Sequence, residues 1–373
     1  MSFFLIYLPA FLVLLTVLVF VHELGHFLIA RRCGVRVEVF SIGFGPEIFG
    51  WTDRMNTRWK VSALPLGGYV KMFGEGAYSG GGDSGHPLTA AERTVSFSDK
   101  KLWQRAAIVF AGPASNYVFA VIALSILLMA VGQPNTPPIV GTVVQGSAAE
   151  AAGIKPGDEF LRVDGYDIER FRDVQRVVRL RPEEPLQIVL KRDGKTVTLV
   201  ATPKAAEDTD ISGNKGKIGL LGVTQKISGF QKLGPVDAVV EATRQSYQMS
   251  ADILTAVGQF ITGKRSVREL GGPVRIGQLS GDTARLGLVP FVSLAVMLSI
   301  NLGLINLFPI PMLDGGHLLF YAIEAVRGKP LDERAQEIGF RIGLVVVLGL
   351  MLFVTFNDLV NLSVFEFVKN LIT

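Results

Sequence analysis

The sequence is poor in charge and nearly free of cysteine. Charged residues make up 19% of the 373 residues, below the roughly 25% that is usual for soluble proteins, and the mean hydropathy is +0.39. Disordered chains combine low hydrophobicity with high charge, so this composition excludes disorder for most of the chain. The one cysteine, Cys33, excludes an intrachain disulfide framework. What is left indicates a membrane protein with a soluble part of modest size.

The charge balance gives no sign of a nucleic-acid partner. The net charge is +4 and the isoelectric point is about 9.1. The sequence nevertheless has no dense stripe of Lys and Arg interleaved with aromatic residues, the pattern that nucleic-acid binding requires. We therefore expect basic loops beside a membrane and no nucleic-acid partner.

Four apolar runs are long enough to cross a bilayer, whose hydrocarbon core of about 30 Å takes about 20 helical residues. They lie near residues 3–21, 106–131, 286–313 and 342–362. The first run lacks the basic start and small-residue end of a cleaved signal peptide, so we expect it to be retained. The sequence thus predicts a polytopic α-helical membrane protein with four transmembrane helices.

Basic residues are distributed unequally between the connections, which predicts the orientation. Residues 1–30 contain no Lys or Arg, whereas the connections 31–105 and 314–341 are basic. The positive-inside rule places short basic connections in the cytoplasm. We therefore expect a multi-pass protein of a bacterial inner membrane, with both termini and residues 132–285 in the periplasm.

The first run leads into a group of ionisable residues, His22-Glu23-Leu24-Gly25-His26. Histidines four positions apart lie about 40° apart on one helix face, so both can bind one metal ion. Each ionisable side chain costs at least about 2.5–3.5 kcal/mol inside a membrane, so three together need a shared role. A helix end that reaches water is the alternative, but the apolar residues 27–30 argue against it. The motif predicts zinc bound by His22 and His26, with Glu23 as general base.

A zinc ion with three protein ligands needs one more donor, and Asp314 is the best candidate. The first and third runs cross in the same direction, and both motifs lie toward the inner end, so they reach a similar depth. Pro309 and Pro311 break the third run, which is tolerated at membrane depth only inside protein or beside a water-filled cavity. A helix that simply ends at an Asp-Gly-Gly turn is the alternative.

Taken together, several motifs resemble the site-2 protease family of intramembrane zinc metalloproteases. They are HELGH at 22–26, SIGFGP at 41–46, LPLGGYVKM at 64–72, FAGPASN at 110–116 and NLFPIPMLDGGH at 306–317. The resemblance covers all the membrane parts in the family's order. It departs from the best-known bacterial members in one respect, because these carry two tandem PDZ domains and this chain has room for one.

The resemblance implies a metalloendopeptidase with one Zn²⁺ per chain, held by His22, His26 and Asp314, and with Glu23 as catalytic base. It assigns substrate binding to Asn306, Pro309 and Pro311. It also implies single-pass transmembrane substrates in regulated intramembrane proteolysis. These would be anti-sigma factors pre-cut by a periplasmic site-1 protease, and remnant signal peptides.

Residues 35–73 alternate between apolar and polar side chains, as strands do, with glycine breaks. A small cytoplasmic sheet and a membrane-associated β-loop beside the metal both explain this pattern, and the resemblance favours the β-loop. Its edge could hold an unwound substrate by strand addition. The candidate substrate-binding glycines are Gly43, Gly45, Gly67 and Gly68.

Three other segments allow weaker predictions. Residues 76–89 are expected to form a mobile loop, whose His86 is not a metal ligand. Gly112, Pro113 and Asn116 open the second span, and the choice between helix packing and a role in a substrate cavity stays open. Residues 236–261 have apolar positions at helical spacing, which predicts a helix lying either on the outer leaflet or against the soluble domain.

Residues 137–204 predict one PDZ domain of the α+β type, located in the periplasm. The run SAAEAAGIKPGDEFLRVDG is distinctive, and a hairpin is expected across Asp193-Gly194. PDZ domains bind extended peptides by strand addition, and we place the groove near Ile139, Val140 and Gly141. A steric plug that binds nothing is the alternative.

These predictions divide the chain as follows: first transmembrane helix 1–34, β-loop and flexible loop 35–105, second helix 106–132, PDZ domain 137–204, linker and amphipathic helix 205–285, third helix 286–317, fourth helix 340–362 and tail 363–373. The alternative function is a PDZ-bearing membrane scaffold with a structural zinc site, against which an intact Glu23 argues. A transporter with a broken third helix is disfavoured because no inverted repeat is visible.

Overall fold

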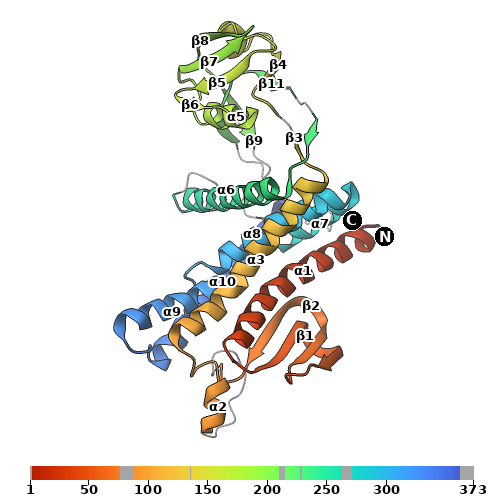
Figure 1. Cartoon of the computed structure of the whole chain (residues 1–373), viewed down its shortest axis with the longest axis vertical. Helices are drawn as coiled ribbons and strands as arrows, with labels where there is room; N and C mark the ends of the chain where they lie inside the picture. The colour runs from red at the N-terminus through yellow and green to blue at the C-terminus, as the bar shows by residue number, and fades with distance from the viewer. Residues whose placement is uncertain are drawn as a thin grey trace, which may run out of the picture. The chain divides into compact units, whose positions relative to one another are not determined.

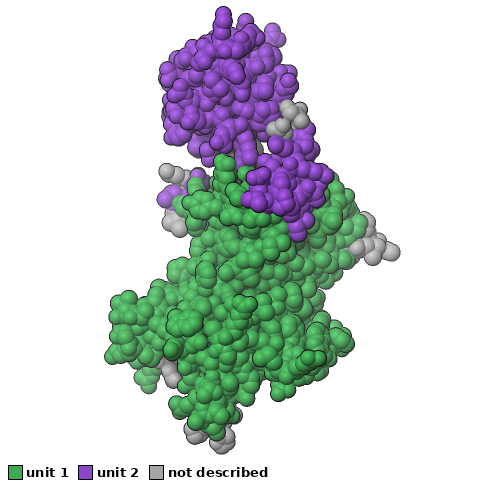
Figure 2. Space-filling view, in the orientation of Figure 1, with its two compact units in different colours: residues 1–125, 239–258, 270–373 green, residues 126–238, 259–269 purple. Residues whose placement is uncertain are grey.

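The computed structural model describes residues 2–75, 88–134, 136–209, 215–226, 229–262 and 271–361. The predicted loop containing His86 lies mostly outside these residues, as does the tail 363–373. The chain forms two compact units, coloured separately in Figure 2. The first unit comprises residues 1–125, 239–258 and 270–373, and the second comprises residues 126–238 and 259–269.

Four helices are long and apolar enough to cross a membrane. They are α1 (Ser2–Arg32), α3 (Leu102–Ala130), α8 (Leu288–Asn306) and α10 (Glu333–Asn361). In the first unit, α1 packs through Leu14 and Leu18 against Leu294 and Ala295 of α8. By contrast, only 6% of the apolar stretch of α10 is buried inside the protein. Most side chains of this helix therefore face outward.

The predicted third span is broken into two helices. The helix α8 ends at Asn306, and α9 (Asp314–Arg327) begins after a turn. The prolines Pro309 and Pro311 explain the break because neither can donate a backbone hydrogen bond and their rings clash with a preceding turn. Asp314 therefore lies at the N-terminus of a new helix rather than near the end of a long one.

The predicted strands form a hairpin of β1 (Val37–Thr52) and β2 (Arg58–Met72) alongside α1 (Figure 1). Two successive stretches of β2 pair with β1, so that Phe40 lies opposite both Val70 and Trp59. The hairpin packs on α1 through aromatic rings, with Phe27 and Phe40 centroids 5.4 Å apart. Asp53 fixes the turn because it accepts hydrogen bonds from Trp59 and from the helix residue Arg31.

The second unit has an α+β core built on a sheet with the strand order β6-β5-β7-β8. These strands are β5 (Glu159–Val163), β6 (Tyr166–Asp167), β7 (Leu186–Arg192) and β8 (Lys195–Ala201), with helices α4 (Ala148–Ala151) and α5 (Phe171–Arg179). The largest fully buried side chains include Phe160 and Phe171. The buried Asp158, 1% exposed, pairs with Arg192 across the fold.

The segment predicted as a linker contains more structure than expected. The additional strands of this unit are β9 (Lys204–Thr209) with β10 (Lys215–Leu220), β11 (Val223–Gln225) with β4 (Val140–Val143), and β12 (Phe230–Gln231) with β3 (Gln133–Pro134). The helices of this segment are α6 (Pro235–Ile261) and α7 (Pro273–Leu286). Outside this segment, the short helix α2 (Ala90–Val95) precedes α3. Within the first unit, α6 packs through Met249 and Ile253 against residues of α3 and α8.

Candidate metal centre

His22, His26 and Asp314 come together from α1 and the first turn of α9. One ligand atom from each residue lies within 4.8 Å of those of the other two. His22 Nε2 is 3.1 Å from Asp314 Oδ2, and His26 Nε2 is 3.6 Å from Asp314 Oδ1. Both histidines are 8% exposed. The spacing of four residues on one helix therefore places both imidazoles on the side that meets α9.

The donor set suits zinc, which binds imidazole nitrogen and carboxylate oxygen. Asp314 Oδ2 is buried and accepts no hydrogen bond from the residues that the structure describes. A buried carboxylate oxygen without a donor is costly, and a cation between Asp314 and the two histidines would satisfy it. The three residues thus form a site that a zinc ion fits.

Helix α3 packs behind the two histidines and holds them in place. His26 Nδ1 lies 2.9 Å from the carbonyl oxygen of Ile108, and Asn116 Nδ2 lies 3.1 Å from His22 Nδ1. A Cβ atom on Gly112 would lie 2.2 Å from His26 Nε2. The motif around Gly112 and Asn116 therefore serves the metal centre, which the sequence had left open between packing and a substrate cavity.

The glycines that follow Asp314 set its position. A Cβ atom on Gly315 would lie 2.3 Å from the carbonyl oxygens of Leu307 and Phe308, and one on Gly316 would lie 2.4 Å from that of Ile310. Only residues without side chains allow the first turn of α9 to pack this closely on the preceding loop. The Asp-Gly-Gly sequence thus brings α9 back against the end of α8.

The predicted substrate-binding residues divide into two groups. Asn306 lies at the centre, with its Nδ2 atom 3.4 Å from His22 Nε2, and Gly68 faces α1, where a Cβ would lie 3.4 Å from Glu23 Cγ. The remaining residues shape the backbone around the centre. Gly43, Gly45 and Gly67 have positive φ in the hairpin, and Pro309 and Pro311 form the loop between α8 and α9.

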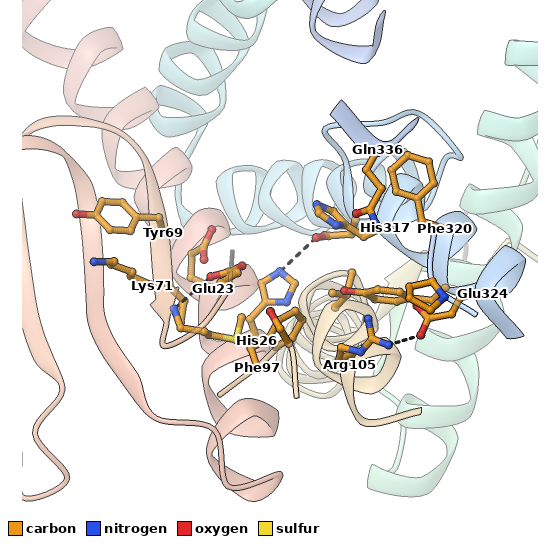
Figure 3. Close-up of a pocket in the computed structure, with 18 of the residues that line it drawn as sticks. Glu23, His26, Tyr69, Lys71, Phe97, Arg105, His317, Phe320, Glu324 and Gln336 are labelled. Carbon is orange, nitrogen blue, oxygen red and sulfur yellow. Dashed lines mark hydrogen bonds and ion pairs between the residues drawn. The ribbon is translucent and has the colours of Figure 1, made fainter. Parts of the chain in front are cut away.

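A cavity of about 1070 Å³ opens onto this centre (Figure 3). Its lining includes Glu23, His26 and Asp314, together with β2 residues from Tyr69 to Met72. Helix α1 therefore presents Glu23 to the same space as the candidate ligands, with the outer edge of β2 beside it.

The far side of the cavity is charged, which the sequence did not predict. Arg105 Nη2 donates to Glu324 Oε1 over 2.6 Å, and these residues are 219 positions apart, so no local pattern reveals the pair. Glu75 also lines the cavity and accepts a hydrogen bond from the Met72 backbone. Burial raises the pKa of Glu75 to about 7, against the opposing effect of that hydrogen bond.

The second unit does not support the predicted peptide groove at Ile139, Val140 and Gly141. Strand β4 pairs with β11, and Val140 is 1% exposed. On its other side, the Val140 N–H donates to Asp158 and its carbonyl accepts from Gly157. A peptide cannot add to a strand whose hydrogen-bonding groups are already used on both sides.

Comparisons with known proteins identify the family of this chain. A model of peptidase family M50 matches residues 10–350. The chain is 46% identical over 362 residues to "Putative zinc metalloprotease Atu1380" of Agrobacterium fabrum, covering 95% of this chain and 96% of that protein. It is 37% identical over 396 residues to Metalloprotease MmpA of Caulobacter vibrioides, covering 99% of each.

Two solved structures of PDZ domains each match about a quarter of this chain. The PDZ domain of the SdrC-like protein Lmo2051 from Listeria monocytogenes covers 23% of this chain and 84% of its own length, at 18% identity and a TM-score of 0.19. The PDZ domain of the SdrC-like protein Lin2157 from Listeria innocua gives a TM-score of 0.20 at 17% identity, covering 26% of this chain and 99% of its own. Scores this low carry no argument about function.

Proposed function

This chain belongs to peptidase family M50, and from that premise we propose that it cleaves peptide bonds within transmembrane segments of single-pass proteins. The chain is a zinc metalloprotease. The observation that carries the intramembrane proposal is the position of the candidate ligands: His22 and His26 lie inside a helix long enough to cross a membrane. A peptide bond that reaches them must enter the layer that such helices span.

The ligands in this proposal are His22, His26 and Asp314, with one Zn²⁺ per chain. A zinc ion bound there supplies Lewis-acid chemistry, because it polarises a carbonyl and favours ionisation of water. Glu23 lies in the wall of the same cavity and is the proposed general base. Its carboxylate takes a proton from the attacking water and returns it to the leaving amine.

The outer edge of β2 is the proposed place for an unwound substrate. Peptide carbonyls in a transmembrane helix are bonded internally, so attack requires local unwinding. The Met72 backbone N–H donates to the carboxylate of Glu75, which lines the cavity, and this contact supports an edge with a donor turned toward the cavity. An extended substrate can add to such an edge by backbone hydrogen bonds. Asn306 lies close enough to the histidines to contact the same segment.

The hairpin tip supports a membrane-associated β-loop. Ile48 is 72% exposed and Phe49 is 62% exposed, and Trp51 and Met55 are also exposed. Several large apolar side chains exposed in one short segment mark a contact with protein or lipid. Because this hairpin packs against α1, we propose that its tip enters the bilayer beside that helix.

The remaining parts of the proposal concern the biological setting. Charge asymmetry supports an inner-membrane protein with both termini and the second unit in the periplasm, and with the active site toward the cytoplasm. We propose pre-cut anti-sigma factors and remnant signal peptides as substrates in regulated intramembrane proteolysis. The PDZ-like unit would then exclude proteins whose outer domains are still intact.

The test uses purified protein reconstituted with a tagged single-pass substrate in liposomes. We expect Glu23→Gln to lower the cleavage rate by about 10²–10⁴-fold, because the base is lost while the zinc content is retained. The matched control is Glu337→Gln, since Glu337 is 57% exposed on α10 and pairs only on the surface with Arg341. Equal cleavage by wild type and Glu23→Gln would exclude Glu23 from the reaction.

A further inference from the structure

The two histidines of the metal centre are held by chemically different groups of α3. His26 Nδ1 lies 2.9 Å from the carbonyl oxygen of Ile108. A carbonyl only accepts hydrogen bonds, so the proton of neutral His26 is on Nδ1 and its Nε2 carries a lone pair. The Nε2 atom is the one that faces Asp314. The backbone of α3 therefore fixes His26 in the tautomer that a metal ligand needs.

Among the described residues, His22 Nδ1 has no such carbonyl and faces a side-chain amide instead. Asn116 Nδ2 lies 3.1 Å from His22 Nδ1. An NH₂ group in this position donates, so Nδ1 accepts and the imidazole proton moves to Nε2. That atom is 3.1 Å from Asp314 Oδ2. An imidazole with its proton on Nε2 has no lone pair there to offer a cation.

The other end of the same amide resolves this conflict. Asn116 is 0% exposed, and its Oδ1 atom is buried with no hydrogen-bond partner in the described part of the chain. Rotation of an amide by about 180° exchanges oxygen and nitrogen, whose assignment follows from the hydrogen bonds they make. With Oδ1 toward His22, the oxygen accepts the Nδ1 proton of His22, and Nδ2 takes the buried position that has no partner among the described residues. The proton of His22 then resides on Nδ1, and Nε2 is free.

We propose that Asn116 is a positioning residue of the metal centre, whose Oδ1 accepts the Nδ1 proton of His22 and keeps His22 Nε2 available to zinc. The inference rests on the proposed function, since it requires His22 to be a zinc ligand. Ser299 of α8 holds the same residue by donating to the Asn116 carbonyl over 2.9 Å. Asn116 is thus fixed between the ligand helix α1 and α8, with little freedom to leave its place.

Two substitutions separate the acceptor role from the alternatives. Asn116→Asp has nearly the same shape but can only accept, whereas Asn116→Leu has similar volume and neither donates nor accepts. The readout is zinc affinity of the full-length protein in detergent, measured by competition with a chromophoric chelator. We expect Asn116→Leu to bind zinc about 10–100-fold more weakly and Asn116→Asp to remain within about threefold of wild type. The absorption spectrum of the Co²⁺-loaded protein reports the ligand geometry independently of activity.

The control is Ser293→Ala, which removes an exposed hydroxyl of the same helix α8 whose hydrogen bond goes to the Val289 carbonyl of that helix. It should bind zinc like wild type, and thermal melts of all chelator-treated variants check folding. Zinc binding by Asn116→Asp as weak as by Asn116→Leu would overturn the inference, and so would wild-type affinity in Asn116→Leu. If Asn116→Leu does not fold, the zinc affinity of Asn116→Asp tests the inference by itself. Loss of zinc binding in Asn116→Asp, which keeps an acceptor, would contradict the acceptor role. A wild-type protein that binds no zinc would instead overturn the proposed function, and the inference with it.

Discussion

Individual glycines decide whether the metal centre can form at all. In α1, a Cβ atom on Gly25 would lie 2.2 Å from the carbonyl oxygen of Ala111, and one on Gly112 would reach His26 equally closely. Gly25 thus lets the two backbones approach, as small residues permit at helix crossings in membranes, and Gly112 leaves room for the imidazoles. This contact places the amide of Asn116 and the carbonyl of Ile108 within reach of the imidazoles.

We predict that Gly112→Ala removes zinc binding and lowers cleavage by at least about 100-fold, because a displacement of about 1 Å at catalytic groups has effects of this size. Zinc content per chain and the cleavage rate measure the effect. Gly349→Ala is the matched control, since Gly349 lies in α10 and, apart from the nearby backbone of that helix, no described atom lies within 4 Å of an added Cβ. Normal zinc content in Gly112→Ala would show that the helices can separate to accept the methyl group.

Glu75 gives a prediction about pH. Burial raises the pKa of Glu75 from 4.5 to about 7, so the folded state binds a proton that the unfolded state has already lost in this range. Its contribution to stability is therefore present below pH 4.5 and is lost as the pH rises to about 7. We expect Glu75→Gln to raise the melting temperature at pH 8 and to change it little at pH 4.5. If the melting temperatures of the two proteins changed with pH in the same way across this range, the raised pKa of Glu75 would be contradicted.

At the scale of secondary structure, the broken span between α8 and α9 has a clear function. The break allows α9 to begin with Asp314 beside the histidines and leaves Asn306, the last residue of α8, at the same centre. An unbroken helix would separate positions 306 and 314 by about 12 Å along its axis. The prolines therefore bring two polar groups to one place that a continuous helix would keep apart.

The outward-facing helix α10 is tied down near its end by Asp358. This residue is 2% exposed, and its carboxylate accepts the backbone N–H groups of Gly272 and Arg275 at the start of α7. The contact is an N-cap supplied by another helix, which satisfies donors that a helix start leaves free. The cap matters more here than at most helix ends, because α10 buries little other surface.

We predict that Asp358→Ala destabilises the protein by about 1–2 kcal/mol, as loss of a cap does. Thermal unfolding in detergent measures this loss, and Asp358→Asn should keep part of the stability because its amide oxygen still accepts. Glu337→Ala on the same helix serves as the control, since exposed ion pairs contribute little. An unchanged melting temperature in Asp358→Ala would show that α10 is held by other contacts.

At the scale of the whole molecule, the candidate ligands join the beginning and the end of the chain. His22 and Asp314 are brought together across nearly the whole sequence, and the second unit has a core of its own. Binding of zinc to the folded state alone adds stability in proportion to the logarithm of its concentration over the dissociation constant. The metal should therefore stabilise the first unit, which contains α1 and α9.

We predict that removal of zinc with a chelator abolishes cleavage and lowers the melting temperature of the first unit, and that added Zn²⁺ restores both. A concentration of zinc 100 times its dissociation constant corresponds to about 2.7 kcal/mol of stabilisation. The melting temperature of a His22→Ala, His26→Ala double variant should not respond to the chelator. A wild-type melt unaffected by the chelator would contradict a metal bound to the folded state.

The sequence by itself determined the parts that depend on local patterns. The apolar runs have the length of membrane spans, the four-residue spacing of His22 and His26 fixes their common face, and the prolines predict the break before Asp314. Helix and strand periods are properties of neighbouring residues, so they can be read without the fold. The same local reasoning predicted strands in residues 35–73 and the hairpin of β7 with β8.

The tertiary structure alone decided the other contacts between distant groups, beyond the predicted meeting of Asp314 with the two histidines. It pairs β4 with β11 and so moves any peptide groove away from Ile139, and it brings Arg105 to Glu324. It also sets the amide of Asn116 against His22 rather than against a substrate. A buried donor must find an acceptor, but which acceptor it finds depends on how helices and strands far apart in the chain pack together, and no local pattern records that choice.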